Sequence, residues 1–196
     1  MKLSPRLALI PLIVAVALLG AGVATLLTRQ TPTPPPPQTS LIGGPFTMTA
    51  DDGRSVTDRD FKGHPFLVYF GYTHCPDVCP TALLDISQVL KALGPDAKIK
   101  VLFVTVDPAR DTPKIMKAYL ANFDPRIVGL SGTEAQTKAI EHVYRAYAKK
   151  VPGKNGDYTM DHTAIFYLMD KEGRFVSTFR TDRPVKAGAA ELQEYL

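Results

Sequence analysis

The chain has 196 residues, of which 45% are hydrophobic, so it can form a packed core and is not a wholly disordered protein. Its two cysteines are too few for a disulfide framework, a four-cysteine zinc site or an iron–sulfur cluster. The net charge is +4, but residues 1–40 hold Lys2, Arg6 and Arg29 and no acidic residue. The other 156 residues carry 20 basic and 19 acidic side chains, which disfavours a nucleic-acid-binding protein.

Residues 7–27 (LALIPLIVAVALLGAGVATLL) are apolar and uncharged, and as a helix they would be about 30 Å long, the thickness of a bilayer core. Because Lys2 and Arg6 precede this run, the positive-inside rule places residues 1–6 in the cytoplasm and the domain after the run outside. A cleaved signal peptide is the alternative, but its apolar region is usually only about 7–15 residues long. We expect an uncleaved single-pass anchor in a bacterial inner membrane, since no long Arg- and Ser-rich transit segment precedes it.

Residues 28–40 contain a proline-rich run, TPTPPPPQTS, which favours extended polyproline II and cannot pack a core. Ten such residues would form a semi-rigid spacer of roughly 30 Å. A ligand for an SH3-type domain is the alternative, but it suits an exported segment less well. The segment is therefore predicted to be a linker that holds a periplasmic domain, residues 41–196, just off the membrane.

The domain begins with a predicted hairpin of residues 46–50 and 54–57 around an Asp-Asp-Gly turn. Residues 65–72 and 99–106 are near-continuous apolar runs typical of buried strands, and residues 81–93 between them have a helical period. Similar patterns predict, further along, a helix, a short strand, a long amphipathic helix, a hairpin and a last helix: residues 113–122, 127–130, 133–150, 163–169 with 174–179, and 184–196.

This order of elements predicts the fold class. A helix between two buried strands implies a right-handed parallel crossover, and the closing antiparallel hairpin makes the sheet mixed. We expect an α/β thioredoxin-like sandwich, a mixed central sheet flanked by helices, with an N-terminal β-hairpin and a preceding transmembrane helix. A flavodoxin-like fold is the alternative, but it would need further parallel strand–helix units in place of the closing hairpin.

Both cysteines lie in one motif, residues 71–80 (GYTHCPDVCP), between a predicted strand and a predicted helix. Backbone N–H groups at a helix start favour negative charge, so we expect the thiolate form of Cys75 to be stabilised. The three residues between Cys75 and Cys79 keep both sulfurs on the loop and the first turn, close enough to share a metal ion or a disulfide. Thioredoxins have two intervening residues, so this motif differs from theirs. Two buried structural cysteines are the less favoured interpretation.

Two thiolates alone seldom complete a metal site, and His162 is the best candidate for a third ligand. It stands directly before the predicted strand 163–169, whose start lies against the cysteine loop in a thioredoxin-like sandwich. Two sulfurs and one imidazole nitrogen suit Cu(I) and are compatible with Cu(II), although zinc accepts the same ligand types.

Other candidate side chains are weaker as ligands: His64, His74, His142 and Met160. Three carboxylates lie near the predicted site: Asp107 and Asp111 follow the second buried strand, and Asp161 precedes His162. The carboxyl edge of such strands is where sites of α/β proteins gather. The segment of Asp107 and Asp111 either forms a turn and a helix cap or orients the metal loop or a partner, and Asp161 is a further candidate for such contacts.

Three motifs, residues 71–81, 106–112 and 161–163, together resemble the SCO/SenC family of copper chaperones for cytochrome c oxidase assembly. The likeness spans about residues 41–196. It implies a thioredoxin fold, one copper ion on Cys75, Cys79 and His162, and delivery to the dinuclear copper site of oxidase subunit II. It also implies an upstream copper donor or a thiol reductant as a further partner.

The residues also support a second function. Cys75 and Cys79 could cycle through a disulfide, and such a disulfide would empty the metal site because it is a poor ligand. The chain is then either a metallochaperone, which is not an enzyme, or a thiol–disulfide oxidoreductase that reduces the oxidase cysteines. A peroxidase is less favoured, because peroxiredoxins have threonine where this chain has Tyr72.

Overall fold

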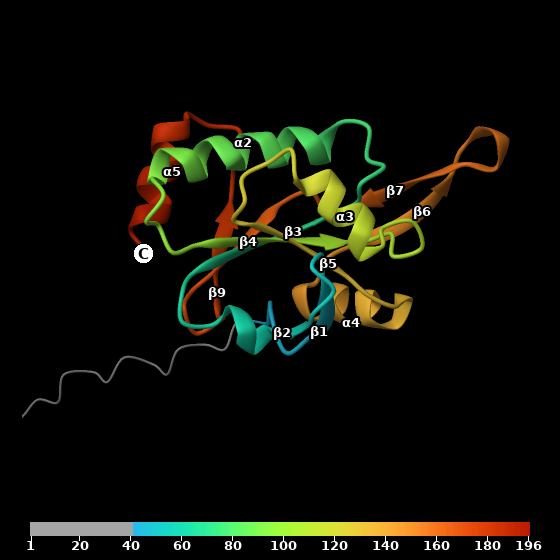
Figure 1. Cartoon of the computed structure of the whole chain (residues 1–196), viewed down its shortest axis with the longest axis horizontal. Coiled ribbons are helices and arrows are strands. Elements are labelled where there is room, and N and C mark those ends of the chain that lie inside the picture. Colours follow the sequence, from blue (N-terminus) through green and yellow to red (C-terminus); the bar gives the residue numbers. More distant parts are fainter. Residues whose placement is uncertain (1–40) are drawn as a thin grey trace, which may run out of the picture. The chain divides into compact units, whose positions relative to one another are not determined.

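A seven-stranded mixed sheet forms the centre of the structure, a computed structural model that describes residues 41–196 (Figure 1). The strands are arranged in the order β2-β1-β5-β4-β3-β8-β9. Their bounds are Thr47–Ala50 (β1), Ser55–Thr57 (β2), Phe66–Gly71 (β3), Lys100–Thr105 (β4), Ile127–Ser131 (β5), Phe166–Met169 (β8) and Phe175–Phe179 (β9). Two further strands, β6 (Ala148–Pro152) and β7 (Tyr158–His162), pair only with each other among the described residues.

The central strands β3, β4 and β5 run parallel, and β8 pairs antiparallel with β3. Every residue of β3 is buried, because helices cover both faces of the sheet (Figure 1). The two predicted hairpins are present as β1–β2 and β8–β9. The mixed, thioredoxin-like sandwich that the sequence predicts is therefore confirmed.

The helices lie on the two sides of this sheet (Figure 1): α2, α3 and α5 are on one side and α4 is on the other. Their bounds are Val78–Leu93 (α2), Pro113–Leu120 (α3), Glu134–Tyr144 (α4) and Val185–Gln193 (α5), and two short 3-10 helices span Asp58–Phe61 and Lys154–Gly156. The predicted cap of α3 is confirmed, since the Thr112 side chain accepts a hydrogen bond from the Ile115 N–H and proline is the first helical residue.

The predicted long helix 133–150 is wrong in its last six residues. Helix α4 ends at Tyr144, because Arg145 takes the left-handed conformation (φ 55°). The chain then forms β6, which pairs with β7 in a hairpin that extends away from the sheet (Figure 1). His162 is consequently the last residue of β7 rather than the residue before a strand 163–169, and β8 begins only at Phe166. The apolar period of residues 133–147 predicted too long a helix, because β6 forms only by pairing with β7, a strand ten residues further along the chain.

The predicted cytoplasmic segment 1–6, anchor 7–27 and linker 28–40 all lie outside the described residues. Within residues 41–196, none of the helices combines the length and the apolar character needed to span a membrane.

Asp124 and Arg126 connect the start of β5 to the end of α2. The carboxylate of Asp124 accepts hydrogen bonds from the Arg126 guanidinium at 2.7 and 2.8 Å, and the guanidinium also donates to the Gly94 carbonyl at 2.8 Å. Hydrogen bonds from Arg126 hold the pKa of Asp124 below its ordinary value of 3.8, despite burial, which raises it. A lowered pKa contributes stability that is present above the ordinary value and lost as the pH falls through the folded-state value.

We therefore expect Asp124→Asn to melt at a lower temperature than the parent at neutral pH and to lose less stability on acidification. Thermal unfolding between about pH 5 and pH 2 measures this difference. Asp96→Asn is the matched control, since Asp96 is an exposed aspartate. If the parent and Asp124→Asn lost equal stability over this range, the assigned role of Asp124 would be wrong.

Candidate metal centre

Three side chains from separate parts of the sequence converge at one end of the sheet. Cys75 lies in the loop before α2, Cys79 in the first turn of α2, and His162 at the end of β7. Their sulfur and nitrogen atoms all lie within 4.8 Å of one another. In residues 41–196 this is the one group of three or more His, Cys, Asp or Glu side chains placed to hold a metal ion.

The two cysteines are free thiols in different surroundings. Cys75 is half-buried, and its Sγ accepts a hydrogen bond from the Cys79 backbone N–H at 3.4 Å. This contact lies at the start of α2. Cys79 is fully buried, and burial raises the pKa of its thiol well above the usual range. A metal ion must therefore displace a proton from Cys79, which makes binding tighter as the pH rises.

The imidazole of His162 presents Nε2 to the sulfurs. Its Nδ1 lies 3.2 Å from the carbonyl oxygen of Thr163, which can only accept, so this contact assigns the proton of a neutral imidazole to Nδ1 and leaves Nε2 free to bind a metal ion. Nε2 lies 3.5 Å from the Cys79 Sγ. The rings of Tyr69 and Tyr72 meet the imidazole edge-on, with centroids 6.4 and 5.7 Å away. The ring is thus oriented before any metal binds.

Gly71 leaves the space that the buried sulfur occupies. A Cβ atom at this position would lie 3.0 Å from the Cys79 Sγ and 2.6 Å from a ring carbon of Phe103. Any larger residue would therefore displace the sulfur or the ring.

Asp111 holds the cysteine loop to the end of β4. It is completely buried, and its carboxylate accepts hydrogen bonds from the Thr73 N–H at 3.0 Å, the Thr73 hydroxyl at 2.6 Å and the Thr105 hydroxyl at 2.7 Å. Thr73 is two residues before Cys75. Asp111 therefore contacts the loop that carries the first sulfur.

Asp107 contacts the hairpin instead of the cysteine loop. Its carboxylate accepts a 2.8 Å hydrogen bond from the Tyr158 hydroxyl and pairs with the Arg110 guanidinium. That guanidinium also lies 3.7 Å from the centroid of the Tyr158 ring. Tyr158 and His162 are four residues apart on the same face of β7, since side chains alternate along a strand. The three residues thus fix the strand that carries His162.

Tyr158 was not identified from the sequence. Residues 158–162 alternate between half-buried and exposed: Tyr158, Met160 and His162 are half-buried, and Thr159 and Asp161 are exposed. This alternation is typical of a strand, and a strand here would have placed Tyr158 on the same face as His162.

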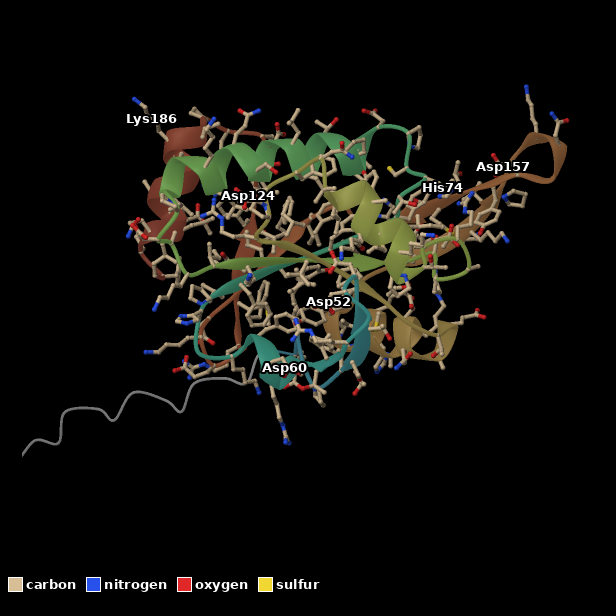
Figure 2. The ribbon with its side chains drawn as sticks, in the orientation of Figure 1. Asp52, Asp60, His74, Asp124, Asp157 and Lys186 are labelled. Atoms are coloured by element: carbon tan, nitrogen blue, oxygen red, sulfur yellow. The ribbon has the colours of Figure 1, made fainter. Side chains whose placement is uncertain are left out.

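The weaker candidates lie away from the sulfurs. The His74 side chain is 50% exposed on the loop before α2 (Figure 2), and its Nδ1 lies 3.1 Å from the Thr73 hydroxyl. His64 and His142 are exposed, and Met160 packs against the core. Asp161 is exposed on the opposite face of β7 from His162, so it lies outside the group of three ligand atoms. Its role as a partner contact stays a prediction.

Two sulfurs and an imidazole nitrogen, held this close, are the donor set of a soft metal ion. Residues 34–196 match the family model described as SCO1/SenC. The chain belongs to the SCO1/SenC family. The SCO2-like protein RP587 of Rickettsia prowazekii is 39% identical to it over 149 residues, which are 74% of this chain and 72% of that protein.

Another SCO1/SenC relative, the mitochondrial protein SCO2 of Saccharomyces cerevisiae, is 37% identical over 159 residues. The match covers 79% of this chain but 53% of the yeast protein, so the chain spans about half the length of that relative.

Solved SCO structures share the fold described above. Copper-bound ScoI of Bradyrhizobium japonicum has a TM-score of 0.77 and 58% sequence identity, over 79% of this chain and 99% of that one. Copper-bound yeast Sco1 has a TM-score of 0.72 and 36% identity, over 79% and 87% of the two chains. The match covers almost the whole of the ScoI structure, so that structure holds little beyond the fold that it shares with this chain.

Proposed function

We propose that this chain is a copper chaperone that binds one copper ion through Cys75, Cys79 and His162. The observation that carries the proposal is the convergence of two sulfurs and one nitrogen within 4.8 Å. Copper in the similar structures of ScoI and yeast Sco1 supports the choice of metal. The soft donor set agrees with that choice, since thiolates select Cu(I) and imidazole also suits Cu(II).

The ligands differ in their access to a partner. Cys79 is fully buried, whereas Cys75 and His162 are only half-buried. A partner's thiolate can therefore approach the copper from the side of Cys75 and His162 and displace these ligands first. Cys79 would release the ion last and regain its proton as it does so. Ligand exchange of this kind moves the copper without a change of oxidation state.

The recipient that we propose is subunit II of cytochrome c oxidase, at its dinuclear copper site. The family resemblance supports this partner, and the related-fold protein BsSco is described as a member of the Sco family of cytochrome c oxidase assembly proteins. We further propose that residues 7–27 anchor the chain in a bacterial inner membrane, with residues 28–40 as a spacer and the domain in the periplasm. An upstream copper donor or a thiol reductant would complete the cycle.

Copper titration of the reduced domain, residues 41–196, tests the proposed site. We expect one copper ion per chain and, with Cu(II), a sulfur-to-copper charge-transfer absorption. Cys79→Ser should lose this absorption and bind copper at least about 100-fold more weakly, since it replaces a thiolate by a neutral hydroxyl. Asp161→Asn is a control that should bind as the parent does, because Asp161 lies outside the ligand group. A domain that takes up no copper, or takes it up equally without Cys79, would refute the site.

A thiol–disulfide oxidoreductase is the second candidate, favoured by the contact of the Cys79 N–H with the sulfur of the half-buried Cys75. In that reaction the Cys75 thiolate attacks a partner disulfide, and one partner sulfur leaves as a thiolate. Cys79 then loses its proton and attacks Cys75, which forms the Cys75–Cys79 disulfide and releases the second partner thiolate. Two electrons pass from this chain to the partner. His162→Ala and Cys75→Ser separate this activity from copper binding.

A further inference from the structure

The β6–β7 hairpin, which extends away from the sheet (Figure 1), has one covered edge and one open edge. Among the described residues, β6 pairs with β7 alone and β7 with β6 alone. On the outer edge of β7, the Arg110 guanidinium donates a hydrogen bond to the Tyr158 carbonyl at 3.2 Å. No residue from 41 to 196 makes a hydrogen bond to the outer edge of β6, and four of the five residues of this strand are exposed.

The hydrogen bonds at the two ends of the hairpin show which backbone groups of β6 face outward. The Thr163 N–H donates to the Tyr147 carbonyl at 2.9 Å, and the Gly153 N–H donates to the Asp157 carbonyl at 2.8 Å. In an antiparallel pair, residues that bond to the partner strand alternate with residues whose N–H and C=O groups point away from it. The odd-numbered residues of β6 therefore bond to β7, and the even-numbered residues present their backbone groups to the outside.

The composition of β6 selects what can pair with this open edge. Ala148 and Lys150 each offer an outward N–H and C=O, and Pro152 offers a carbonyl. The strand holds two lysines, Lys149 and Lys150, and no acidic residue. A second copy of β6 would bring lysines of the two copies together, and like charges on paired strands are destabilising. A strand that carries carboxylates would instead gain from the same lysines.

A cavity of about 410 Å³ adjoins the edge, between the hairpin and the start of α4. Lys150, Tyr158 and Met160 line it from the hairpin, and Glu134 and Lys138 line it from α4. The Lys150 ammonium lies 3.5 Å from the centroid of the Tyr158 ring, so its charge is held at the wall of this cavity. Side chains directly opposite each other on paired strands lie about 5 Å apart, so an acidic side chain opposite Lys150 would reach that charge.

We propose that the open edge of β6 is a docking site for an extended, acidic segment of a partner protein, which adds to the hairpin as a third strand. Ala148 pairs with His162 across the hairpin. Because neighbouring strands lie about 4.8 Å apart, the docked segment would pass roughly 10 Å from the backbone of His162. The edge would then hold a partner beside the metal centre. This use of the edge rests on the proposed function, whereas the docking itself requires no copper.

A fluorescently labelled peptide of alternating valine and glutamate, with blocked ends, tests the proposal on the copper-free, full-length chain. Fluorescence anisotropy measures the affinity. Lys150→Pro removes one outward N–H and leaves the hydrogen bonds between β6 and β7 in place, so it should bind the peptide at least about tenfold more weakly. Lys150→Ala is the matched control, because it keeps the N–H and removes only the charge. It should weaken binding by about two- to fivefold.

Two measurements on the parent chain need no variant and so do not depend on whether Lys150→Pro folds. The same peptide with methyl groups on the amide nitrogens that face β6 should not bind, since it can no longer donate to the Lys150 carbonyl. Amide hydrogen exchange at Ala148 and Lys150 should slow when the unmodified peptide binds, because a third strand covers these N–H groups. A peptide of alternating valine and lysine should bind at least about tenfold more weakly than the acidic one.

The outcomes separate this inference from the proposed function. A Lys150→Pro variant or an N-methylated peptide that binds as tightly as the originals would overturn strand addition at β6. Equal binding of the acidic and basic peptides would overturn the acidic partner. A dimer of the chain that Lys150→Pro abolishes would show that a second copy occupies the edge instead. A chain that binds the peptide but no copper would refute only the copper function, and a chain that binds copper but not the peptide would refute only the docking site.

Discussion

Replacing His162 by alanine is expected to weaken copper binding at least about 100-fold, because even residues outside the ligand shell of a metal contribute about 10–100-fold. The variant removes the one nitrogen among the three donor atoms and leaves both sulfurs in place. No other histidine of the described residues lies in the ligand group, and His74 is half exposed on the outside of the loop. Competition between the reduced domain and a Cu(I) chelator measures the affinity.

His74→Ala is the matched control, since it removes the histidine nearest to the cysteines in sequence and should leave the affinity unchanged. His162→Ala should still form and reduce a Cys75–Cys79 disulfide at close to the parent rate, whereas Cys75→Ser should not. A reductase function would therefore survive in His162→Ala and be lost in Cys75→Ser. The three-ligand site would be wrong if His162→Ala bound copper as tightly as the parent.

Asp111→Ala should destabilise the domain by at least about 3 kcal/mol, because it leaves three buried or half-buried donors unpaired at about 1–3 kcal/mol each. These donors are the Thr73 N–H, the Thr73 hydroxyl and the Thr105 hydroxyl, and their acceptor is completely buried. A loss of this size lowers the melting temperature of a domain this long by roughly 6–12 °C. Urea unfolding of the reduced, metal-free domain measures the free energy directly.

Asp111→Asn should fall between the parent and Asp111→Ala, since the amide keeps one acceptor oxygen and turns an NH₂ donor toward another donor. Asp96→Ala, at an exposed aspartate, should change the free energy of unfolding by no more than about 0.5 kcal/mol. Copper binding by Asp111→Ala should weaken as well, because the loop that carries Cys75 loses its attachment to β4. An Asp111→Ala domain within about 1 kcal/mol of the parent would show that the three hydrogen bonds contribute little.

Strands and helix caps that depend on neighbouring residues were predicted correctly from the sequence. The buried run of residues 65–72 became β3, and the Thr-Pro pair at residues 112–113 became the cap of α3. Both depend on neighbours a few residues apart, so the pattern along the chain was sufficient. The predicted helix 133–150 was wrong beyond Tyr144, because the end of α4 and the start of β6 depend on the left-handed Arg145 and on pairing with a strand ten residues further along the chain.

The candidate site shows the same division. The chemistry of the cysteine motif could be predicted, since Cys75 and Cys79 share one loop and one helical turn. His162 was predicted as the third ligand, and the structure places it beside both sulfurs. Its position on β7 and the orientation of its ring were not predictable, because they depend on the hairpin and on the Thr163 carbonyl. The contacts of Tyr158 with Asp107 and of Asp111 with Thr73 join residues 51 and 38 positions apart.

The amino-acid sequence alone predicts the mixed sandwich, the pair of cysteines at a helix start and three side chains that could form a soft metal site. Periodicity, capping and motif spacing are properties of residues close together in the chain, so they can be recognised without the tertiary structure. The convergence of His162 on Cys79 across 83 positions and the burial that raises the pKa of Cys79 arise only when strands pair and helices cover the sheet. These features depend on residues that are far apart in the sequence and shield one another from water. Such residues come together only in the folded domain.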